Sequence, residues 1–384
     1  MPEIKQQRWK IVEYSKRQIN DAGNIIRKDN TTAEELAFAT QVIDNWRAAH
    51  AYPMHVIYIH LRRMAAPRND ILVVERLKRL DSIIGKLRRE TRMDLWRMQD
   101  LGGCRFITPS VDEVFHFAEE YKKSRVRHEY KRTYDYIHNP KPSGYRSLHL
   151  VYKYHSEKKD AYNQNMLVEI QFRSRLQHVW ATALETMGLF TKQALKAGQG
   201  AGYVKRFFVL VSSLFAMREN CPIIPGTFKD ENELVSEIEQ INDQYHLLEI
   251  LSAIRVALDH ENGVKLDKKG YYVLILNYIT RKLRIRYFSP SQIDEANTLY
   301  TQIESNHAED EIDAVLVRAA SFSELKAAYP NYFADIGEFL VWGDRIFEKC
   351  GIRRDEGGDG GKTLEIRGKR RLSARDGGAN YQQS

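Results

Sequence analysis

Cysteine is scarce in this sequence of 384 residues, which contains only Cys104, Cys221 and Cys350. The three are far apart and lack the spacing of paired metal ligands, which argues against a disulfide framework or a zinc site and fits a reducing compartment. Apolar runs are all too short to cross a bilayer. The N-terminal stretch lacks the apolar centre of a secretory signal, so we expect a cytoplasmic protein without a membrane partner.

Acidic residues are fewer than basic ones: 51 Asp and Glu stand against 59 Lys and Arg, a formal net charge of +8. This balance favours an anionic partner, either a nucleic acid or a nucleotide. Much of the positive charge is concentrated in two segments, Arg76–Arg92 and Lys122–Arg132. Such clusters favour contact with phosphates over a uniformly solvated surface.

The pattern of apolar residues predicts an α+β fold, a mixed β-sheet flanked by helices, with a smaller α+β domain toward the C-terminus. Short strands are expected near 104–108, 147–154 and 166–172, with helices between and after them. Further along, 231–258 reads as one long amphipathic helix and 271–289 as a β-hairpin.

These patterns divide the chain into five segments. They are N-terminal helices at 1–64, a catalytic domain at 65–200, a linker region at 201–225, a second domain at 226–350 and a tail at 351–384. Near the start, Thr32 and Glu35 have the spacing of a capping box for a helix that Pro53 interrupts. The tail is rich in Gly and charge, so we expect it to be disordered.

The first basic segment predicts a helix with a polar face that suits a polyphosphate. Lys78, Ser82 and Lys86 recur at every fourth residue, which places a hydroxyl between two ammonium groups on one side, and Arg76 flanks them. Ammonium groups neutralise phosphate and a hydroxyl can donate to it. An ordinary amphipathic helix with a solvated basic face fits the same pattern.

Three further segments carry candidate site residues. Asp100 precedes a Gly-Gly turn, where a carboxylate can hold a divalent cation or simply cap the turn. Glu169, Gln171 and Arg173 alternate with apolar residues and therefore share one face of a strand. His178 follows at the start of a helix, where a structural role is the commoner one.

The loop "PKPSGYRSLH" contains more than a connector needs. Gly144 lets the backbone turn, but the tyrosine and the cations beside it are not turn formers. Lys141 and Arg146 can reach phosphates, and Tyr145 offers a flat ring that can stack on a base. His149 lies on the strand that follows.

In their order along the chain these segments resemble the synthetase domain of the RelA/SpoT family, the enzymes that make the alarmones ppGpp and pppGpp. The motifs are R-x-K…S…K (Arg76 to Lys86), D-x-x-G-x-R (Asp100 to Arg105), P-K-x-x-G-Y-R-S-L-H (Pro140 to His149) and E-I-Q-x-R (Glu169 to Arg173), then His178. The resemblance implies transfer of the β,γ-pyrophosphate of ATP to a ribose 3′-hydroxyl, with Mg²⁺ as cofactor and AMP as the leaving group.

The resemblance also assigns a role to each matching residue. Asp100 and Glu169 would be the catalytic residues and bind magnesium, and Glu169 is the candidate base. ATP would be held by Arg76, Lys78, Ser82, Lys86 and Arg105. The acceptor would be held by Lys141, Tyr145, Arg146, His149, Gln171 and His178.

The sequence departs from ordinary alarmone synthetases in two places. Ser143 stands where their loop usually has asparagine, which weakens the case for a guanine nucleotide. Near the C-terminus, Tyr329 and Tyr332 form a Y-x-x-Y element that resembles the fused antitoxin domain of CapRel-type toxic synthetases. That resemblance implies transfer to the 3′-CCA end of tRNA, autoinhibition through this element, and release by a phage protein such as the major capsid protein.

Several interpretations stay open at this point. The basic residues at Lys122–Arg132 and after Lys192 are expected to contact the acceptor stem of a tRNA. The chain can instead be an alarmone synthetase acting on GDP, GTP or an adenine nucleotide, or a non-catalytic module that senses RNA or nucleotides. The two tyrosines of the Y-x-x-Y element can also be ordinary core residues.

Overall fold

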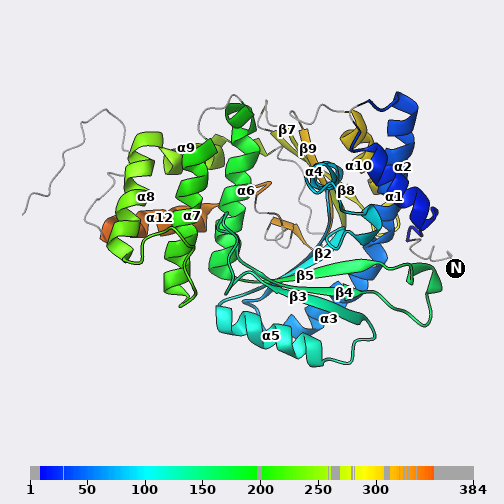
Figure 1. Ribbon diagram of the computed structural model, residues 1–384, viewed down its shortest axis with the longest axis horizontal. Helices are drawn as coiled ribbons and strands as arrows, with labels where there is room; N and C mark the ends of the chain where they lie inside the picture. The colour runs from blue at the N-terminus through cyan, green and yellow to red at the C-terminus, as the bar shows by residue number, and fades with distance from the viewer. Residues whose placement is uncertain are drawn as a thin grey trace, which may run out of the picture.

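The computed structural model describes most of the chain (Figure 1). The described residues are 9–28, 30–196, 201–257, 259–260, 269–277, 280, 282–306, 312–319, 321–322, 325–326, 329, 331–333 and 335–349. The predicted tail at 351–384 lies outside these ranges. No helix in these ranges combines the length and apolar character needed to span a membrane.

A mixed five-stranded sheet forms the centre of the molecule, which confirms the predicted α+β class. Its strands are β1 (Leu72–Leu77), β2 (Gly102–Thr108), β3 (Glu129–Asp135), β4 (Leu148–Lys153) and β5 (Leu167–Ser174). Their spatial order is β1-β2-β5-β4-β3. Only β2 and β5 run parallel, and each of the other neighbouring pairs is antiparallel.

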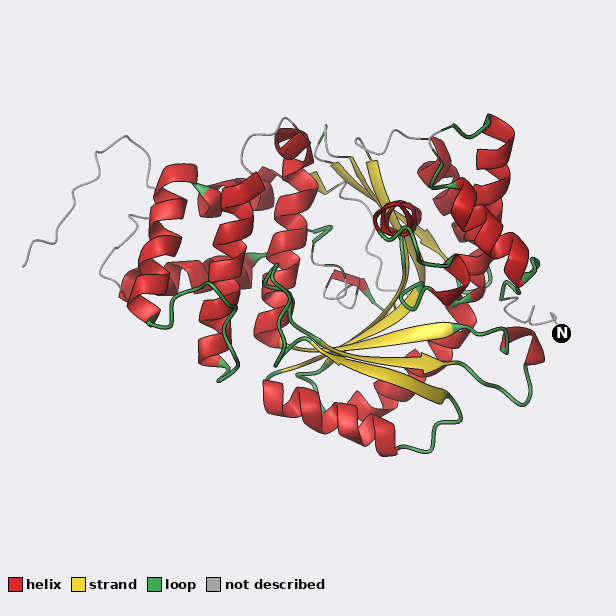
Figure 2. Cartoon of the chain, viewed as in Figure 1, coloured by secondary structure: helices red, strands yellow, loops and turns green. Residues whose placement is uncertain are grey.

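Two helices cover one face of this sheet (Figures 1 and 2). These are α3 (Ala51–Ala65) and α5 (Val111–Lys123), which enclose a hydrophobic core with the apolar side chains of the strands. Ile57 of α3 and Phe106 and Phe172 of the sheet are fully buried there. The period-two alternation therefore sends the polar side chains of β2 and β5 to the opposite face.

The N-terminal helices pack beside the sheet. They are α1 (Lys16–Ile25) and α2 (Ala33–Ala49), and the capping box at Thr32 is formed as predicted. Helix α2 ends at Ala49, four residues before Pro53, and Pro53 lies in the first turn of α3, where its missing N–H costs no hydrogen bond. The next helix, α4 (Leu80–Arg89), buries Ile83 and Leu87 against this group. Two short 3₁₀ turns, Leu95–Arg97 and Asp160–Tyr162, belong to the same hydrophobic cluster.

A helical bundle forms the other end of the molecule (Figure 1). It contains α6 (Arg175–Lys196), α7 (Ala201–Arg218), α8 (Glu231–Tyr245), α9 (Leu247–Ala257) and α12 (Gly337–Lys349), which share one hydrophobic cluster. The single helix predicted over 231–258 is wrong, because His246 adopts a left-handed conformation, φ 52°, and divides it. The domain boundary near 226 remains a prediction.

A second sheet follows α9 in sequence and precedes α12. Its strands are β6 (Asp259–His260), β7 (Gly270–Asn277), β8 (Lys282–Phe288) and β9 (Ile312–Ala319), in the order β6-β8-β7-β9. The predicted hairpin is confirmed as β7 and β8. Helix α10 (Ile293–Asn306) packs on one face, and the other face shares a hydrophobic cluster with Val74 of β1. The second sheet is therefore docked onto the edge of the first.

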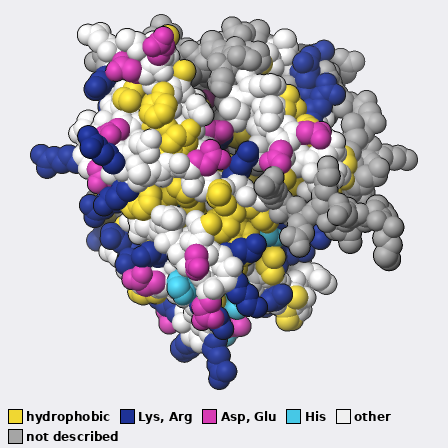
Figure 3. All heavy atoms as spheres, turned by 90° about the vertical axis from the view of Figure 1, so that its right-hand side faces the viewer, with side chains coloured by type: hydrophobic (Ala, Val, Ile, Leu, Met, Phe, Trp, Pro, Cys, Tyr) yellow, Lys and Arg dark blue, Asp and Glu magenta, His cyan; other side chains and the backbone are white. Residues whose placement is uncertain are grey.

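Charge is not gathered into one patch on the end of the molecule that carries α1 and α2. Figure 3 shows Lys and Arg side chains spread over this face, with Asp and Glu side chains among them. The net positive charge alone therefore does not locate a partner here, and the polar face of the central sheet is the better guide.

Candidate active site

The register of the central sheet lines up the candidate residues in rows. On β5, Gln171 lies between Arg105 of β2 and His149 of β4, and Glu169 lies between Gly103 and Val151. Directly paired residues project to the same side of a sheet. Glu169, Gln171, Arg105 and His149 therefore share the face that α3 and α5 leave uncovered.

Two lysines hold Asp100 at one edge of this face. Lys78 Nζ lies 2.8 Å from Asp100 Oδ2, and Lys86 Nζ lies 3.1 Å from Oδ1. Burial alone would raise the pKa of Asp100, but the two ammonium groups outweigh it and lower this pKa below its usual value. Asp100 is therefore ionised at neutral pH.

The predicted helical spacing of these cations is only partly right. Helix α4 begins at Leu80, so Ser82 and Lys86 are on it, one turn apart. Arg76 belongs to β1, and Lys78 follows that strand. The cations converge because β1 leads directly into α4, although they do not share one helical face.

Glu169 is a buried carboxylate with two partners. His149 Nδ1 lies 3.1 Å from Oε2, and Gln171 Nε2 donates to Oε1 at 2.6 Å. Burial would raise the pKa of Glu169, but the imidazole and the amide lower it below its usual value. The carboxylate is therefore ionised and oriented.

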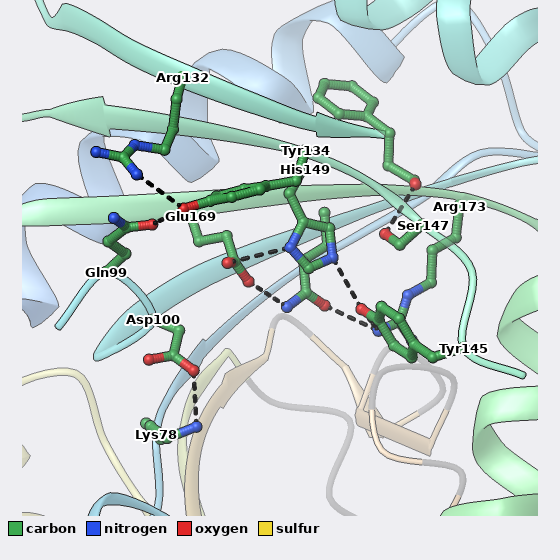
Figure 4. A network of polar contacts seen from close by, with 12 residues as sticks. Lys78, Gln99, Asp100, Arg132, Tyr134, Tyr145, Ser147, His149, Glu169 and Arg173 are labelled. Atoms are coloured by element: carbon green, nitrogen blue, oxygen red, sulfur yellow. Dashed lines mark hydrogen bonds and ion pairs between the residues drawn. The ribbon is translucent and has the colours of Figure 1, made fainter. Parts of the chain in front are cut away.

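A chain of hydrogen bonds continues from Glu169 to the loop (Figure 4). With Nδ1 of His149 donating to the carboxylate, Nε2 accepts from the Tyr145 hydroxyl at 2.8 Å. Arg173 Nη2 donates in turn to the Tyr145 oxygen at 2.7 Å and to Gln171 Oε1 at 3.0 Å. The network links the Tyr145 hydroxyl to the Glu169 carboxylate through the His149 ring.

The loop that carries Tyr145 depends on Gly144. Its φ is +92°, a conformation that side chains rarely adopt, and its N–H donates to the Lys141 carbonyl at 2.9 Å to close the turn. A Cβ on Gly144 would lie 2.8 Å from the Trp180 ring and 3.1 Å from Ser212 Cβ. The loop is therefore packed tightly against α6 and α7.

One pocket collects most of the residues that the sequence assigned to ATP and metal. It is lined by Arg76, Lys78, Asp100, Gly103, Arg105, Glu169 and Gln171. Lys86 reaches this pocket through its ion pair with Asp100. Two carboxylates and several cations meet there, as a site for a metal-bound polyphosphate requires.

Of the six predicted acceptor residues, Gln171 lines this pocket, Tyr145 and His149 join it through hydrogen bonds, and Lys141 lies over the Tyr145 ring. The other two, Arg146 and His178, are held elsewhere. Arg146 is buried and donates to Ser212 Oγ, to the Ile137 carbonyl and to the Pro222 carbonyl at 2.7–3.2 Å, so its guanidinium holds the loop against α7. His178 lines a neighbouring cavity. Burial and nearby arginines lower its pKa far below the usual value, which keeps it neutral.

The sequence reasoning did not assign Arg173 a role, although the alternation of β5 placed it on the same face as Glu169. Nε and Nη1 of Arg173 are buried and have no hydrogen-bond partner among the described residues. Unpaired buried donors are costly unless a ligand satisfies them. Arg173 is therefore a candidate to contact a phosphate.

The two carboxylates are suitable ligands for magnesium. Mg²⁺ is usually held by one or two protein carboxylates together with substrate phosphates and water. The charge of Asp100 opposes the net lowering of the Glu169 pKa, so the two carboxylates are near enough to repel each other, and a bound cation would relieve this repulsion. No group of three or more potential metal ligands occurs among the described residues. The fit is therefore to a two-carboxylate site.

The Y-x-x-Y element lies against the strand that carries Arg76. Tyr329 and Tyr332 are each 2% exposed. The Tyr329 hydroxyl donates to the Glu75 carbonyl at 2.9 Å, and the Tyr332 hydroxyl donates to Asp313 Oδ2 at 2.8 Å. Asp313 also forms an ion pair with Arg79. Both tyrosines are thus core residues of the contact between the two sheets.

Comparisons with known proteins agree with this geometry. The family described as the region found in RelA/SpoT proteins matches residues 75–192. GTP pyrophosphokinase YjbM of Bacillus subtilis is 35% identical over 112 residues, 29% of this chain and 52% of the relative. GTP pyrophosphokinase YwaC of the same organism is 30% identical over 115 residues, 28% of this chain and 52% of the relative.

A search of solved structures finds the small alarmone synthetase 1 from Bacillus subtilis. It is 25% identical, with a TM-score of 0.37, and the match covers 44% of this chain and 88% of that one. The chain spans about half the length of the curated relatives it matches. Within these bounds, residues 75–192 match the region found in RelA/SpoT proteins, and this part of the chain is similar in sequence to two GTP pyrophosphokinases.

Proposed function

We propose that this chain is an ATP-dependent pyrophosphotransferase that modifies the 3′-CCA end of tRNA and is held inactive by its own C-terminal part. The observation that carries the proposal is the pocket in which Asp100 and Glu169, both ionised, meet Arg76, Lys78 and Arg105. Modification of the tRNA 3′ end would block aminoacylation and stop translation.

The reaction would place the triphosphate of ATP among the cations. Arg76, Lys78, Lys86 and Arg105 neutralise its charge, and Ser82 donates a hydrogen bond. Mg²⁺, held by Asp100 and Glu169, would supply further neutralisation of the β-phosphate when bound.

Glu169 is suited to accept the proton of the attacking hydroxyl. As the acceptor 3′-oxygen forms a bond to the β-phosphorus, the bond from that phosphorus to the α,β-bridging oxygen breaks and AMP leaves. The contact with His149 orients the Glu169 carboxylate during this step. The lowered pKa of Glu169 keeps this carboxylate ionised, so it is able to accept the proton.

The acceptor side supports a nucleic acid. The ring of Tyr145 can stack on the terminal base, and Lys141 Nζ lies 5.2 Å from its centroid, near enough to meet a phosphate. The segment Lys122–Arg132 runs from the end of α5 into β3 and is largely exposed. Among the basic side chains after Lys192, that of Lys196 lies outside the described ones, that of Lys205 is exposed, and that of Arg206 forms an ion pair with Glu237.

The C-terminal part would inhibit the enzyme by occupying the approach to the ATP residues. The Tyr329 hydroxyl donates to the main-chain carbonyl of Glu75, next to Arg76. Asp313 forms an ion pair with Arg79 at the start of α4. A phage protein such as the major capsid protein, bound to the C-terminal part, would withdraw these contacts and release the activity.

A free guanine nucleotide is the second candidate acceptor. It is favoured by the two curated relatives, both named as GTP pyrophosphokinases. Ser143, in place of the usual asparagine, weighs against it. A non-catalytic sensing module is disfavoured, because it would not need both ionised carboxylates.

The test uses γ-labelled ATP, magnesium and the full chain carrying Tyr329→Ala and Tyr332→Ala. Deacylated tRNA, GDP and GTP are offered separately. We expect label on tRNA and none without the double substitution. Label on GDP or GTP alone would show that the acceptor is a guanine nucleotide and not tRNA. Label on none of the three would refute the enzymatic function.

A further inference from the structure

Strand β3 adds two tyrosines to the face that carries Glu169. Tyr134 is paired with His149, which is paired with Gln171, so all three project to one side of the sheet. The Tyr136 N–H donates to the Ser147 carbonyl at 3.0 Å and continues the same register. Neither tyrosine belongs to the ATP or metal sites described above.

The two rings are arranged as parallel plates. Their planes differ by 4° and their centroids are 5.8 Å apart. Tyr136 in turn meets Tyr145 at 6.0 Å. The rings of Tyr134, Tyr136 and Tyr145 therefore form a continuous row, and the three side chains are half-buried.

Cations lie over the plates. Lys141 Nζ is 4.3 Å from the centroid of the Tyr136 ring, and Arg132 Cζ is 5.9 Å from that of Tyr134. Figure 4 shows Arg132 and Gln99 on either side of the Tyr134 hydroxyl, which they bind at 3.1 and 3.2 Å. The hydroxyl is thus anchored, while one cation stands beside each ring.

A row of rings with interleaved cations on an open sheet face is an arrangement that binds single-stranded nucleic acid. A mononucleotide stacked on Tyr145 would not contact the rings of Tyr134 and Tyr136, whereas a longer strand could stack further bases on them. We propose that Tyr134 and Tyr136 form a stacking platform for the nucleotides that precede the acceptor nucleotide in a single-stranded polynucleotide 3′ end. The inference rests on the proposed function and names the substrate class of that same site.

The first test needs no substitution. The full chain is titrated with fluorescein-labelled RNA of increasing length, ending in A, CA, CCA and ACCA, and binding is followed by fluorescence anisotropy. We expect the affinity to rise about 5- to 150-fold for each added nucleotide that finds a ring, and to level off after CCA. An affinity that stays flat from A to ACCA overturns the platform.

The second test removes the rings one at a time. Tyr134→Ala and Tyr136→Ala should each weaken binding of the CCA-ending RNA by about 5- to 150-fold, while Tyr134→Phe and Tyr136→Phe keep the wild-type affinity. Tyr130→Ala is the matched control, since Tyr130 is paired with Tyr152 and packs against it on the opposite face. Folded alanine variants that bind as tightly as the wild type would overturn the platform.

Failure of the platform and failure of the proposed function are separable. If the derepressed enzyme labels tRNA and Tyr136→Ala leaves the KM for tRNA unchanged, the platform is refuted and the function stands. If no acceptor is labelled but affinity rises with RNA length and falls on loss of the rings, the platform stands without the transfer reaction.

Discussion

Glu169 and Asp100 illustrate how single residues acquire chemistry from their neighbours. Each carboxylate is buried, which by itself favours the neutral form, and each is kept ionised by specific donors. His149 and Gln171 serve Glu169, whereas Lys78 and Lys86 serve Asp100. In the proposed reaction both carboxylates would hold Mg²⁺, and Glu169 would also accept the proton of the attacking hydroxyl.

Replacing Glu169 with Gln should remove catalysis and keep the fold. The amide cannot accept a proton, so we expect the rate of label transfer to fall about 10²- to 10⁴-fold. Glu120→Gln, on the exposed side of α5, is the control and should retain the wild-type rate. A Glu169→Gln protein with near-normal turnover would mean that another group is the base.

Asp100→Asn should lower the free energy of unfolding, because the ionised carboxylate stabilises the folded chain. The folded-state pKa of Asp100 lies below its ordinary 3.8. Ionised Asp100 therefore stabilises the folded chain fully above pH 3.8, and this contribution is lost as the pH falls through the lower pKa. In urea unfolding, we expect Asp100→Asn to cost about 1–3 kcal/mol, constant from pH 7 to 5. A cost that already declines between pH 7 and 5 would contradict this assignment.

Residue chemistry could be predicted only where it is local. The alternation in "VEIQFR" is sufficient by itself to place Glu169, Gln171 and Arg173 on one face of a strand. Arg146 could not be placed in this way, because its partners include a carbonyl at Pro222, far along the chain. In the sequence, a cation in a loop that is expected to bind phosphate can serve equally well to hold the loop in place or to bind the ligand.

At the scale of elements, the loop between β3 and β4 connects the candidate active site with the helical bundle. Arg146 binds Ser212, and the Ser212 hydroxyl donates to the Gly144 carbonyl at 2.6 Å. The position of Tyr145 is therefore set by α6 and α7 as well as by the sheet.

Gly144→Ala should damage this loop more than the equivalent change at another turn. Gly226 has nearly the same φ, +85°, but nothing within 4 Å of an added Cβ. Both substitutions carry about 1–2 kcal/mol of backbone strain. Gly144→Ala adds the collision with Trp180, about 1–3 kcal/mol more. Thermal unfolding measures the difference, and equal losses of Tm would show that the close packing is not energetically important.

Element boundaries were the least predictable feature. The four-residue spacing from Lys78 to Lys86 suggested a helix, yet tertiary pairing of β1 with β2 keeps the backbone extended through Leu77. Likewise the apolar period continues across His246 although the helix breaks there. β1 and β3 were not predicted, since their many charged residues obscure the alternation that marks a half-buried strand.

At the scale of the whole molecule, the C-terminal part is joined to the rest by several contacts. Tyr329 and Asp313 contact the strand and helix that carry the residues proposed to bind ATP, and Arg47 of α2 donates to the Tyr300 hydroxyl of α10 at 2.9 Å. Leu234 of α8 and Phe339 of α12 belong to the same core as α6 and α7. Truncation near residue 226 would expose that core, so point substitutions in the full chain are the better probe of autoinhibition.

Asp313→Asn should release the enzyme while preserving the shape of the contact. Loss of a buried partner to Arg79 is expected to weaken docking about 30-fold or more, because removing one member of a buried charge pair costs about 2–5 kcal/mol. Label transfer by the full chain should rise accordingly. Asp335→Asn, an exposed change in the same part of the chain, should leave the rate as it was. Equal rates in the two variants would contradict autoinhibition through this contact.

The most direct test of the central claim follows where the pyrophosphate is attached. The full chain with Tyr329→Ala and Tyr332→Ala is incubated with γ-labelled ATP, magnesium and tRNA ending either in adenosine or in 3′-deoxyadenosine. The account predicts label on the first tRNA and none on the second, since only the first presents the attacking hydroxyl near Glu169. Label on neither tRNA, or equal label on both, would contradict it.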